Sequence, residues 1–523
     1  MSNAIHSAHM MGPIAYRMGM LVALRSMSLG GLHVGLMITA SHNSEEDNGV
    51  KAIEPSGDML DASWEVFADD IVNTPDDLLD QKIFELKTTI FGKQLRKDNV
   101  NAYKANVLLG RDTRASGKEL TQLAIQGILK LGGSIQDFGI VTTPQLHFLV
   151  GELGPRFYKE ILADAYYSKI SQGFEKFISS ICFSHTEQIA SNVFVDTANG
   201  VGHLALKEVL NSIHNLPIKV NLLQCGNGVL NEKCGADYVK ISNCPPAGVS
   251  FVDPSYRYVS FDGDADRVVY FYFDEKQQFQ LIDGDRMAAL FAFFISKHLK
   301  ILGLQSSLSV GVIQTAYSNG ACQKYLIEEL ETCLELTCTG VKHLHSAAKK
   351  YDSGIYFEAN GHGTILFSGK FKKALAFLSS PEKMNALSST ERSSVGLLCG
   401  LVETINSYVG DAISDFLAVE GVLLSLGFSM KDWKSMYTEH PSKQAKISVP
   451  DRSIFKTTHY EQKLLEPAGI QEKIDGIVNP MHGGRAFVRP SGTENVVRIY
   501  AEASQAADVD IIIESIQNLL NCH

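Results

Sequence analysis

Three stretches of the chain repeat one pattern of hydrophobic and polar positions. Each combines a run of β-branched and aliphatic residues, a loop rich in Gly, Asp and Asn, and a segment in which apolar residues recur with helical spacing. The apolar runs are HVGLMITA at 33–40, NVFVD at 192–196 and SLSVGVIQTAY at 307–317. This alternation predicts α/β layers with mixed or parallel sheets, in which functional side chains lie at the carboxyl ends of the strands.

The C-terminal part of the chain follows a different pattern. Residues 435–455 have the polar, Pro-containing composition of a linker, and residues 484–503 predict a strand, a loop and a second strand before a helix near 508–520. The predicted fold class is therefore α/β, with three mixed- or parallel-sheet α/β domains and a smaller C-terminal α+β domain. The expected boundaries are 1–158, 159–283, 284–438 and 439–523. The segment 155–190 fits either a linker or helices packed on the first two domains.

A chain of 523 residues, 45% hydrophobic and 20% charged, is typical of a multidomain globular protein. Its longest apolar run, 287–295, is shorter than the about 20 residues of a membrane-spanning helix and predicts a buried helix. The first residues lack the basic and then apolar layout of a secretory signal, so we expect a cytoplasmic protein with reduced cysteines. The cysteines are scattered and form no CxxC pair, which argues against a zinc ribbon and a disulfide framework.

The formal net charge of -11 at pH 7 bears on the partners of the protein. Affinity for nucleic acid and for anionic membranes depends on basic residues that neutralise phosphates, so we expect neither as a partner. An anionic small molecule requires a local basic pocket instead.

Ser41 follows the first apolar run directly, in ITASHNSEEDNGVK. A hydroxyl on a strand-to-loop turn is well presented as a nucleophile, and His42 and Lys51 supply groups that stabilise charge or relay a proton. The pair Asn48-Gly49 predicts a tight turn that returns Lys51 towards the serine. The alternative is that Ser41 only caps a helix that starts at Glu45.

The loop DGDADR places Asp262, Asp264 and Asp266 at alternate positions, so their carboxylates face the same way in an extended loop. Three converging carboxylates favour magnesium, which takes oxygen ligands. An EF-hand calcium loop is excluded, because Arg267 replaces the Gly at its position six and Phe273 replaces the Glu at its position twelve. A solvated acidic turn is the other alternative, although three carboxylates between apolar strands repel one another unless they are neutralised.

The segment RPSGTENVVR combines guanidinium forks, hydroxyls and a permissive backbone, which together fit a phosphate monoester. Arg489 and Arg498 flank Ser491, Gly492 and Thr493 in this segment. The alternative is an ordinary surface hairpin with two exposed arginines.

The segment FEANGHGT carries Glu358, Asn360 and His362 at alternate positions, which suits a hydroxyl-rich ligand. Isolated histidines such as His147 and His345 are expected to be core or surface residues rather than catalysts. Other cationic candidates lie at predicted strand ends, where a ligand crevice forms: Arg111, Arg114, Lys342 and His343.

The loops TASHN, DGDADR, EANGHG and RPSGTE occur in the order that is typical of the α-D-phosphohexomutase superfamily, which the chain resembles over nearly its whole length. The flanking segments SEEDNGVK, TTPQLH, LNEKCGADYVK and FEANGHGTILF are similar to the phosphoacetylglucosamine mutase family rather than to phosphoglucomutases or phosphomannomutases. The resemblance implies four domains around a central cleft, a phosphoserine at Ser41, and one Mg²⁺ per chain held by that phosphate and by Asp262, Asp264 and Asp266.

The same resemblance implies roles for the remaining candidates. Groups near the transferring phosphoryl group are expected to be Ser41, His42, Lys51, Arg111, Lys342 and His343. Sugar hydroxyls are expected to bind to Glu358, Asn360 and His362. The substrate phosphate is expected to bind to Arg489, Ser491, Gly492, Thr493 and Arg498.

The activity that the resemblance implies is conversion of N-acetylglucosamine 6-phosphate to N-acetylglucosamine 1-phosphate through a sugar 1,6-bisphosphate, in UDP-N-acetylglucosamine biosynthesis. The expected partner is a small amino-sugar phosphate, and the expected state is a monomer or weak homodimer. The chain departs from the family at Ser44 and Asn495, where proline and aspartate are usual, and it opens near the first helix, without the family's first strand and YGTAGFR-like loop. Another sugar specificity within the superfamily and a phosphatase stay open as alternatives, and the absent first strand leaves open a non-catalytic sugar-phosphate binding protein.

Overall fold

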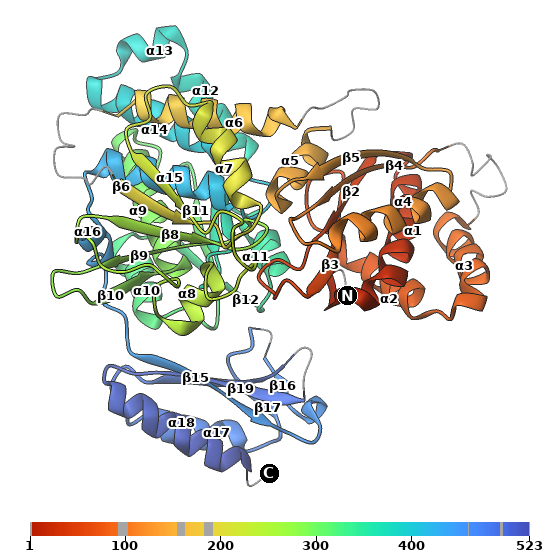
Figure 1. The fold of residues 1–523 in the computed structure, drawn as a ribbon. Coiled ribbons are helices and arrows are strands. Elements are labelled where there is room, and N and C mark those ends of the chain that lie inside the picture. Colours follow the sequence, from red (N-terminus) through yellow and green to blue (C-terminus); the bar gives the residue numbers. More distant parts are fainter. Residues whose placement is uncertain are drawn as a thin grey trace. The chain divides into compact units, whose positions relative to one another are not determined.

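The computed structural model describes residues 3–92, 103–153, 163–181, 192–458, 460–491 and 495–521, which form two compact units (Figure 1). The first unit takes its residues from Met1–Ile181, Glu187–Leu281 and Cys399–Gly421. The second takes them from Ile282–Leu398 and Val422–His523. Within the described residues, no helix is long and apolar enough to cross a membrane.

The first unit begins with a five-stranded mixed sheet in the order β1-β3-β2-β4-β5. Its parallel strands are β2 (His33–Ile38), β4 (Asn106–Arg111) and β5 (Ser134–Ile140), and its antiparallel strands are β3 (Asp47–Ile53) and β1 (Asn3–Ser7). Strand β1, which precedes the first helix, was not predicted from the sequence.

Two helices on this sheet pack with their backbones almost in contact. They are α1 (Met11–Ser28) and α4 (Gly117–Lys130). A Cβ atom added to Gly19 would lie 2.2 Å from the carbonyl oxygen of Ala124, and one added to Gly127 would lie 2.0 Å from that of Tyr16. Only glycine permits this approach, which closes the core beneath β2 and β4.

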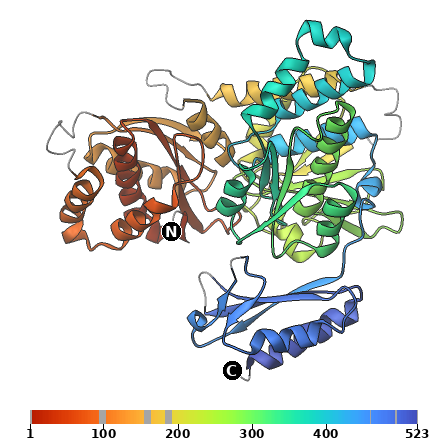
Figure 2. The ribbon, with the colours of Figure 1, turned by 180° about the vertical axis from the view of Figure 1, so that it is seen from behind.

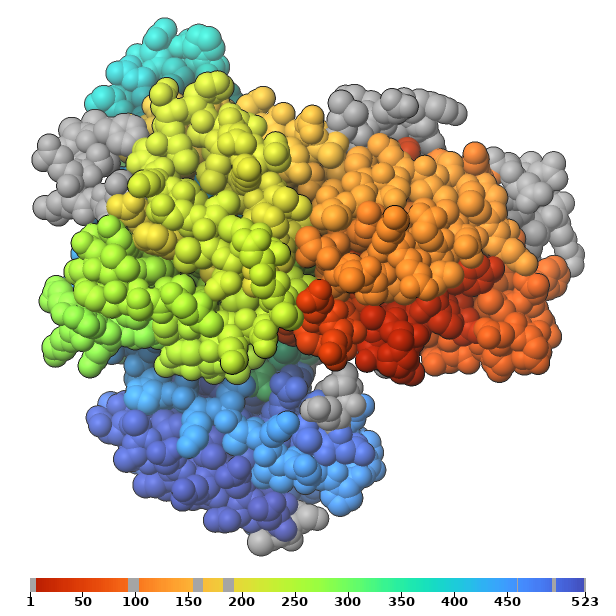
Figure 3. All heavy atoms as spheres, viewed as in Figure 1, coloured from red at the N-terminus to blue at the C-terminus, as the bar shows by residue number. Residues whose placement is uncertain are grey.

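The second sheet of the first unit has the order β10-β9-β8-β6-β7. Its strands are β6 (Asn192–Asp196), β7 (Lys219–Leu223), β8 (Arg257–Phe261), β9 (Val268–Phe273) and β10 (Phe279–Ile282). Strands β8 and β9 are buried along their whole length, as expected of central strands covered on both faces. In Figure 3, atoms of residues 200–250, which include α7 (Gly202–Asn211) and α8 (Ala236–Ser242), form the yellow to yellow-green surface over this sheet.

Further helices complete the first unit. They are α2 (Glu65–Asn73), α3 (Leu79–Phe91), α5 (Thr143–Leu153) and α6 (Asp164–Ser179). Helix α6 lies in the segment 155–190 and confirms the helical interpretation for its described part. Short 3₁₀ turns span Ala8–Met10, Ala62–Trp64 and Asp76–Leu78.

The second unit contains a four-stranded sheet in the order β12-β11-β13-β14. The strands are β11 (Val310–Thr315), β12 (Cys333–Thr337), β13 (Ser353–Phe357) and β14 (Gly363–Phe367), and only the pair β13–β14 is antiparallel. Helix α9 (Gly284–Ile301) contains the apolar run 287–295 and is buried there, as predicted.

The other helices along this part of the chain are mostly short. They are α10 (Gly320–Lys324), a π-helical turn (Tyr325–Glu329), α11 (Val341–Ala348), α12 (Gly369–Leu378), α13 (Pro381–Ala386), α14 (Ser389–Thr404), α15 (Ala412–Leu426) and α16 (Met430–Lys434). The end of α14 and most of α15 belong to the first unit, because residues Cys399–Gly421 are counted there.

The C-terminal sheet has three antiparallel strands in the order β15-β19-β18. They are β15 (Ser442–Ser448), β18 (Arg485–Pro490) and β19 (Val496–Glu502), and β15 contradicts the prediction that 435–455 is only a linker. A small hairpin joins β16 (Lys456–Thr457) to β17 (Leu464–Glu466), after a 3₁₀ turn at Arg452–Ile454. Helices α17 (Ile470–Val478) and α18 (Ala506–Asn521) lie on the same face of the sheet in Figure 1 and Figure 2. Three mixed sheets with helices between their strands, and a smaller antiparallel sheet with two helices, confirm the predicted fold class.

Candidate active site

Ser41 lies on the loop after β2, in a backbone conformation that side chains seldom adopt. Its φ of 52° falls in the left-handed region, and its side chain is buried. Its Oγ donates a hydrogen bond to Oδ2 of Asp262 over 2.6 Å. Glu45 lies in a turn and β3 begins at Asp47, so the interpretation of Ser41 as a helix cap is wrong.

Two side chains hold the backbone of this loop from outside it. Nη2 of Arg114 donates to the carbonyl oxygens of Ser41 at 3.2 Å and of Asn43 at 2.8 Å. Nδ2 of Asn231 donates to the same two oxygens, at 2.9 and 2.8 Å. Arg114 is also paired with the buried carboxylate of Asp112. The sequence interpretation missed Asn231, because a single Asn in a polar stretch has no distinguishing pattern.

Lys51, on β3, reaches the acidic loop, which is formed by residues 262–267 between β8 and β9. Its ammonium nitrogen lies 2.7 Å from Oδ2 of Asp264 and 2.8 Å from Oδ2 of Asp266. Residues Asn48-Gly49 belong to β3, so the predicted tight turn is wrong, and the antiparallel pairing of Lys51 with Met37 positions the side chain instead. Burial acts to lower the pKa of Lys51, but the two carboxylates outweigh it and raise the pKa, so the side chain stays cationic.

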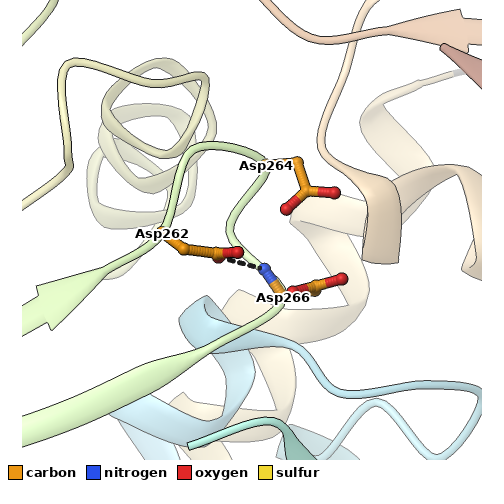
Figure 4. A group of neighbouring side chains, drawn as sticks. All are labelled: Asp262, Asp264 and Asp266. Carbon is orange, nitrogen blue, oxygen red and sulfur yellow. Dashed lines mark hydrogen bonds between the residues drawn. The ribbon is translucent and has the colours of Figure 1, made fainter. Parts of the chain in front are cut away.

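The carboxylates of Asp262, Asp264 and Asp266 converge between β8 and β9, as Figure 4 shows. One ligand oxygen from each lies within 4.8 Å of the others. Their exposed fractions are 1%, 0% and 4%, which contradicts the alternative of a solvated acidic turn. A hydrogen bond of 3.0 Å from the backbone N–H of Asp266 to Oδ1 of Asp262 fixes the curvature of the loop.

The pKa values of these aspartates show that the cluster carries uncompensated negative charge. Burial, followed by the charges of Asp266 and Asp264, holds the pKa of Asp262 well above its usual value. Burial and Asp266 also act to raise the pKa of Asp264, but Lys51 and the hydrogen bonds to it outweigh them and lower that pKa. Among the described residues, Oδ1 of Asp264 is buried without a hydrogen-bond partner. A hard divalent cation would satisfy this oxygen and offset the repulsion, so the residues fit magnesium.

Three helix N-termini hold the backbone of the acidic loop. The carbonyl oxygen of Gly263 accepts from the N–H of Val201 at 3.1 Å, and that of Asp264 accepts from Thr143 at 3.2 Å. The carbonyl oxygen of Ala265 accepts from the N–H of Ala412 at 3.0 Å. These three donors stand at the starts of α7, α5 and α15, respectively. Their partial positive charge stabilises the clustered carboxylates by about 0.3 to 1 kcal/mol each.

The first unit contains two other candidates, His42 directly after Ser41 and Arg111 at the end of β4. Burial lowers the pKa of His42, and the charge of Arg267 lowers it further, so His42 is neutral at pH 7. Arg111 ends β4, and its guanidinium lies 3.8 Å from the carboxylate of Asp137. Of the two arginines in GRDTR, Arg114 is the one whose side chain contacts the backbone of Ser41.

In the second unit, the candidates for sugar binding form a tight loop between β13 and β14. The N–H of Glu358 donates to the carbonyl oxygen of His362 at 2.8 Å. Oδ1 of Asn360 accepts from the N–H of His362 at 3.0 Å, so one oxygen of Asn360 stabilises the loop itself. A Cβ atom added to Gly284 would lie 1.9 Å from the carbonyl oxygen of Glu358, which shows how closely the start of α9 approaches this loop.

The C-terminal sheet carries a row of cations on one face. Register places Arg489 opposite Arg498, and Arg498 opposite Lys446, so the three side chains project from the same face. The alternate residues Val488 and Val497 belong to the core that includes α17 and α18, so the cationic face is the one without helices. Like charges in adjacent positions destabilise a sheet unless an anion lies between them. The sequence interpretation missed Lys446 because it assigned this segment to a linker.

Residues 489–491, at the end of β18 and just after it, make further contacts within the second unit. Nε of Arg489 donates to Tyr317 Oη at 3.0 Å, and its Nη1 donates to Oε1 of Glu461 at 3.0 Å. The buried Ser491 follows β18, and its N–H donates to the carbonyl oxygen of Val496 at 2.9 Å. The predicted ligands Gly492 and Thr493 lie outside the described residues.

Lys342 and His343 lie in the first turn of α11, after β12. His147 and His345 are buried, which confirms that they are core residues. Nδ1 of His147 bonds to the carbonyl oxygen of Gly57 at 2.7 Å, and burial lowers the pKa of His147 to about 4. Nδ1 of His345 lies 3.0 Å from Tyr356 Oη.

The candidate residues divide between the two units. The first contains Ser41, His42, Lys51, Arg111, Asp262, Asp264 and Asp266. The second contains Lys342, His343, Glu358, Asn360, His362, Arg489, Ser491 and Arg498.

Family models match most of the chain. Two of them describe domains II and III of the phosphoacetylglucosamine mutase AMG1 and match residues 161–269 and 283–428. The other two describe phosphoglucomutase/phosphomannomutase: alpha/beta/alpha domain I matches residues 20–78 and 68–161, and the C-terminal domain matches 449–519.

Individual relatives extend this similarity over nearly the full length. Phosphoacetylglucosamine mutase of Homo sapiens is 40% identical over 513 residues, which cover 97% of this chain and 90% of the relative. That of Arabidopsis thaliana is 42% identical over 528 residues, covering 98% and 93%. The structure of N-acetylphosphoglucosamine mutase from Aspergillus fumigatus matches with a TM-score of 0.92 at 37% identity, covering 99% of this chain and 94% of that one. A structure of that enzyme with GlcNAc-6P and magnesium matches with a TM-score of 0.90 at 38% identity, covering 99% and 94%.

Proposed function

The chain belongs to the phosphoacetylglucosamine mutase family, and from this premise we propose that it interconverts N-acetylglucosamine 6-phosphate and N-acetylglucosamine 1-phosphate. The reaction is an intramolecular phosphotransfer, so the protein is an isomerase. The observation that carries the proposal is Ser41 Oγ at 2.6 Å from Asp262, within a group of three buried carboxylates.

In this proposal, Ser41 carries a phosphoryl group and transfers it to the C1 hydroxyl of the 6-phosphate. The bond from phosphorus to Ser41 Oγ breaks, a bond from phosphorus to the sugar oxygen forms, and the hydroxyl proton of the sugar ends on Ser41 Oγ. The resulting 1,6-bisphosphate turns around in the site. Its 6-phosphoryl group then returns to Ser41, and the 1-phosphate leaves.

One Mg²⁺ would be held by Asp262, Asp264, Asp266 and the phosphate on Ser41. When bound, the ion neutralises charge on the phosphoryl oxygens. The residues of the chain do the remaining work. Lys51 keeps its positive charge beside the acidic loop, and the bonds from Arg114 and Asn231 fix the backbone that presents Ser41. Such fixed charge and positioning are the main protein contributions to phosphoryl transfer.

The substrate contacts proposed for the second unit follow the chemistry of its loops. Sugar hydroxyls bind to Glu358, Asn360 and His362. The substrate phosphate binds to Arg489, Ser491, Gly492, Thr493 and Arg498, a role supported by the cationic row on the C-terminal sheet. His42, Arg111, Lys342 and His343 contribute near the transferring phosphoryl group. The four domains of this proposal are bounded at 1–158, 159–283, 284–438 and 439–523.

We place the protein in the cytoplasm, as a monomer or weak homodimer that supplies N-acetylglucosamine 1-phosphate for UDP-N-acetylglucosamine biosynthesis. Neither nucleic acid nor membrane is a partner in this proposal, in keeping with the net charge of -11.

The test is conversion of the 6-phosphate to the 1-phosphate, followed by ³¹P NMR with magnesium and a trace of 1,6-bisphosphate. Ser41→Ala should abolish conversion, because it removes the hydroxyl that carries the phosphoryl group in this mechanism. Ser44→Ala is the matched control, since this exposed serine lies in the same loop and should retain activity. A fully active Ser41→Ala enzyme would contradict the covalent mechanism. Release of free phosphate would indicate a phosphatase, and stabilisation by ligand without conversion would indicate a binding protein.

A further inference from the structure

A buried polar cluster lies next to the acidic loop, to which it connects through the backbone of Ala412. Its side chains are Tyr166 of α6, Asn406 and Asp411 of the connection between α14 and α15, and Ser414 of α15. All four are at least 99% buried. An ionisable group in such a position is costly unless several donors satisfy it.

Asp411 is the shared acceptor of this cluster. Tyr166 Oη lies 3.0 and 2.9 Å from its two carboxylate oxygens, and Nδ2 of Asn406 lies 2.9 Å from Oδ2. Its Oδ1 also accepts from the backbone N–H groups of Ile413 and Ser414, at 3.0 and 3.2 Å. The last two bonds cap the N-terminus of α15. A Ser, Thr or Asn could cap a helix equally well, so the bonds to Tyr166 and Asn406 exceed what capping requires.

Both ends of this cluster connect to the acidic loop. Ala412, the residue after Asp411, donates its N–H to the carbonyl oxygen of Ala265 at 3.0 Å. Nδ2 of Asn406 also lies 3.3 Å from the carbonyl oxygen of Pro144. The residue before that proline, Thr143, holds Asp264 twice, through its N–H to the backbone at 3.2 Å and through its Oγ1 to Oδ2 at 2.6 Å.

We propose that Asp411 is a positioning residue for the magnesium site: it fixes the starts of α15 and α5, which in turn hold the backbone of Ala265 and Asp264. Two of the three helix N-termini on the acidic loop therefore depend on one carboxylate that is not itself a ligand. Ala265 has a φ of 60°, a conformation that Ala seldom adopts, so this part of the loop needs external support. The inference rests on the proposed function only in taking magnesium as the ion.

The test measures binding of Mg²⁺ alone to the full chain by titration calorimetry, without sugar phosphate. Asp411→Asn should raise the Kd for Mg²⁺ about 10-fold, the lower end of the loss seen when residues that orient metal ligands are replaced. Asp415→Asn is the matched control. Asp415 is buried one turn along the same helix, and its Oδ2 accepts from the backbone N–H of Asp411 at 3.4 Å, a bond that the amide oxygen of Asn can keep. Its Kd should stay within about 2-fold of the wild type.

A second readout separates positioning from general stability. In the mutase assay, Asp411→Asn should need more Mg²⁺ for half-maximal activity and should recover a near-normal kcat when Mg²⁺ is saturating. If folded Asp411→Asn binds Mg²⁺ as the wild type does, the inference is overturned. If this variant does not fold, Tyr166→Phe takes its place, and an unchanged Kd would overturn the inference equally. A wild-type chain that binds Mg²⁺ without mutase activity would contradict the proposed function and leave this test intact.

Discussion

Replacement of Glu461 by Gln tests whether Arg489, which we propose binds the substrate phosphate, is held by an internal anion. Oε1 of Glu461 accepts from Arg489 at 3.0 Å, and Oε2 accepts from the N–H and Oγ1 of Thr339, at 3.1 and 2.6 Å. The side chains of Arg489 and Glu461 are only 13% and 20% exposed. A substrate phosphate that binds to Arg489 must therefore compete with this carboxylate or share the guanidinium with it.

The expected gain follows from the change in hydrogen-bond type. Gln keeps an oxygen that can accept from Arg489, but it removes the charge. Because Arg489 stays charged, its bond to Gln still involves one charged group, and the variant loses only the attraction between two opposite charges, which is worth up to about 1 kcal/mol in an ion pair near the surface. The competitor is thus weakened by about 1 kcal/mol, which corresponds to about 5-fold tighter binding of the phosphate.

The assay is the KM for N-acetylglucosamine 6-phosphate, together with the inhibition constant of inorganic phosphate as a ligand without a sugar. Both should fall by that factor in Glu461→Gln. Glu466→Gln is the matched control, because Glu466 lies on the same hairpin and pairs at 2.8 Å with Lys456, both side chains being more than half exposed. A KM that is unchanged or higher in Glu461→Gln would refute the reasoning, because Glu461 would then orient Arg489 for the substrate rather than compete with it.

Two further predictions concern stability. Gly284→Ala should lower the free energy of unfolding, measured in urea, by about 1 to 3 kcal/mol, since the new Cβ would lie 1.9 Å from the carbonyl oxygen of Glu358. It should also raise the KM if the loop between β13 and β14, which we propose binds the sugar, is displaced. An unchanged urea midpoint would show that α9 can move away freely. Burial raises the pKa of Asp196 from the usual 3.8 to about 6, so the folded state binds this proton more tightly than the unfolded chain does. Raising the pH from 4 to 7 should therefore lower the free energy of unfolding by about 2 to 3 kcal/mol through this group. Without magnesium, Asp196→Asn should lack that part of the pH dependence, and an equally steep loss in the variant would contradict the assignment.

The site loops could be predicted because each follows an apolar strand and presents alternating polar residues. The alternation in DGDADR predicted converging carboxylates, and the structure places them within 4.8 Å. Local pattern does not show which distant residues hold such a loop. Asn231 lies 190 positions from Ser41, and its two bonds to the Ser41 loop arise from a tertiary contact of the connection between β7 and α8 with the loop after β2. Lys51 was predicted near the serine for the wrong reason, since strand register and not a turn brings it there.

Two other features could not be predicted from the sequence: a strand of mostly polar residues, and a late segment of the chain that returns to the first unit. Strand β15, SKQAKIS, is mostly exposed at the edge of its sheet, so it lacks the apolar run that identifies a strand, and Lys446 was missed with it. Residues Cys399–Gly421 continue an apolar helical pattern, and nothing in that pattern indicates that they belong with the first unit. The contact of Ala412 with Ala265 lies within that unit and joins positions 147 residues apart.

The position of Ala412 in the chain affects the order in which the protein can mature. When a ribosome has made the first 281 residues, Ser41 and the three aspartates are already present. The N–H that supports Ala265 is made only after a further about 130 residues, which takes about 6 to 26 s at typical rates of synthesis. During that interval the nascent chain has Asp262, Asp264 and Asp266 but only part of the scaffold around them, so full affinity for the ion should develop late in translation. A fragment that ends before residue 399 should stay in that early condition, however well its own sheets fold.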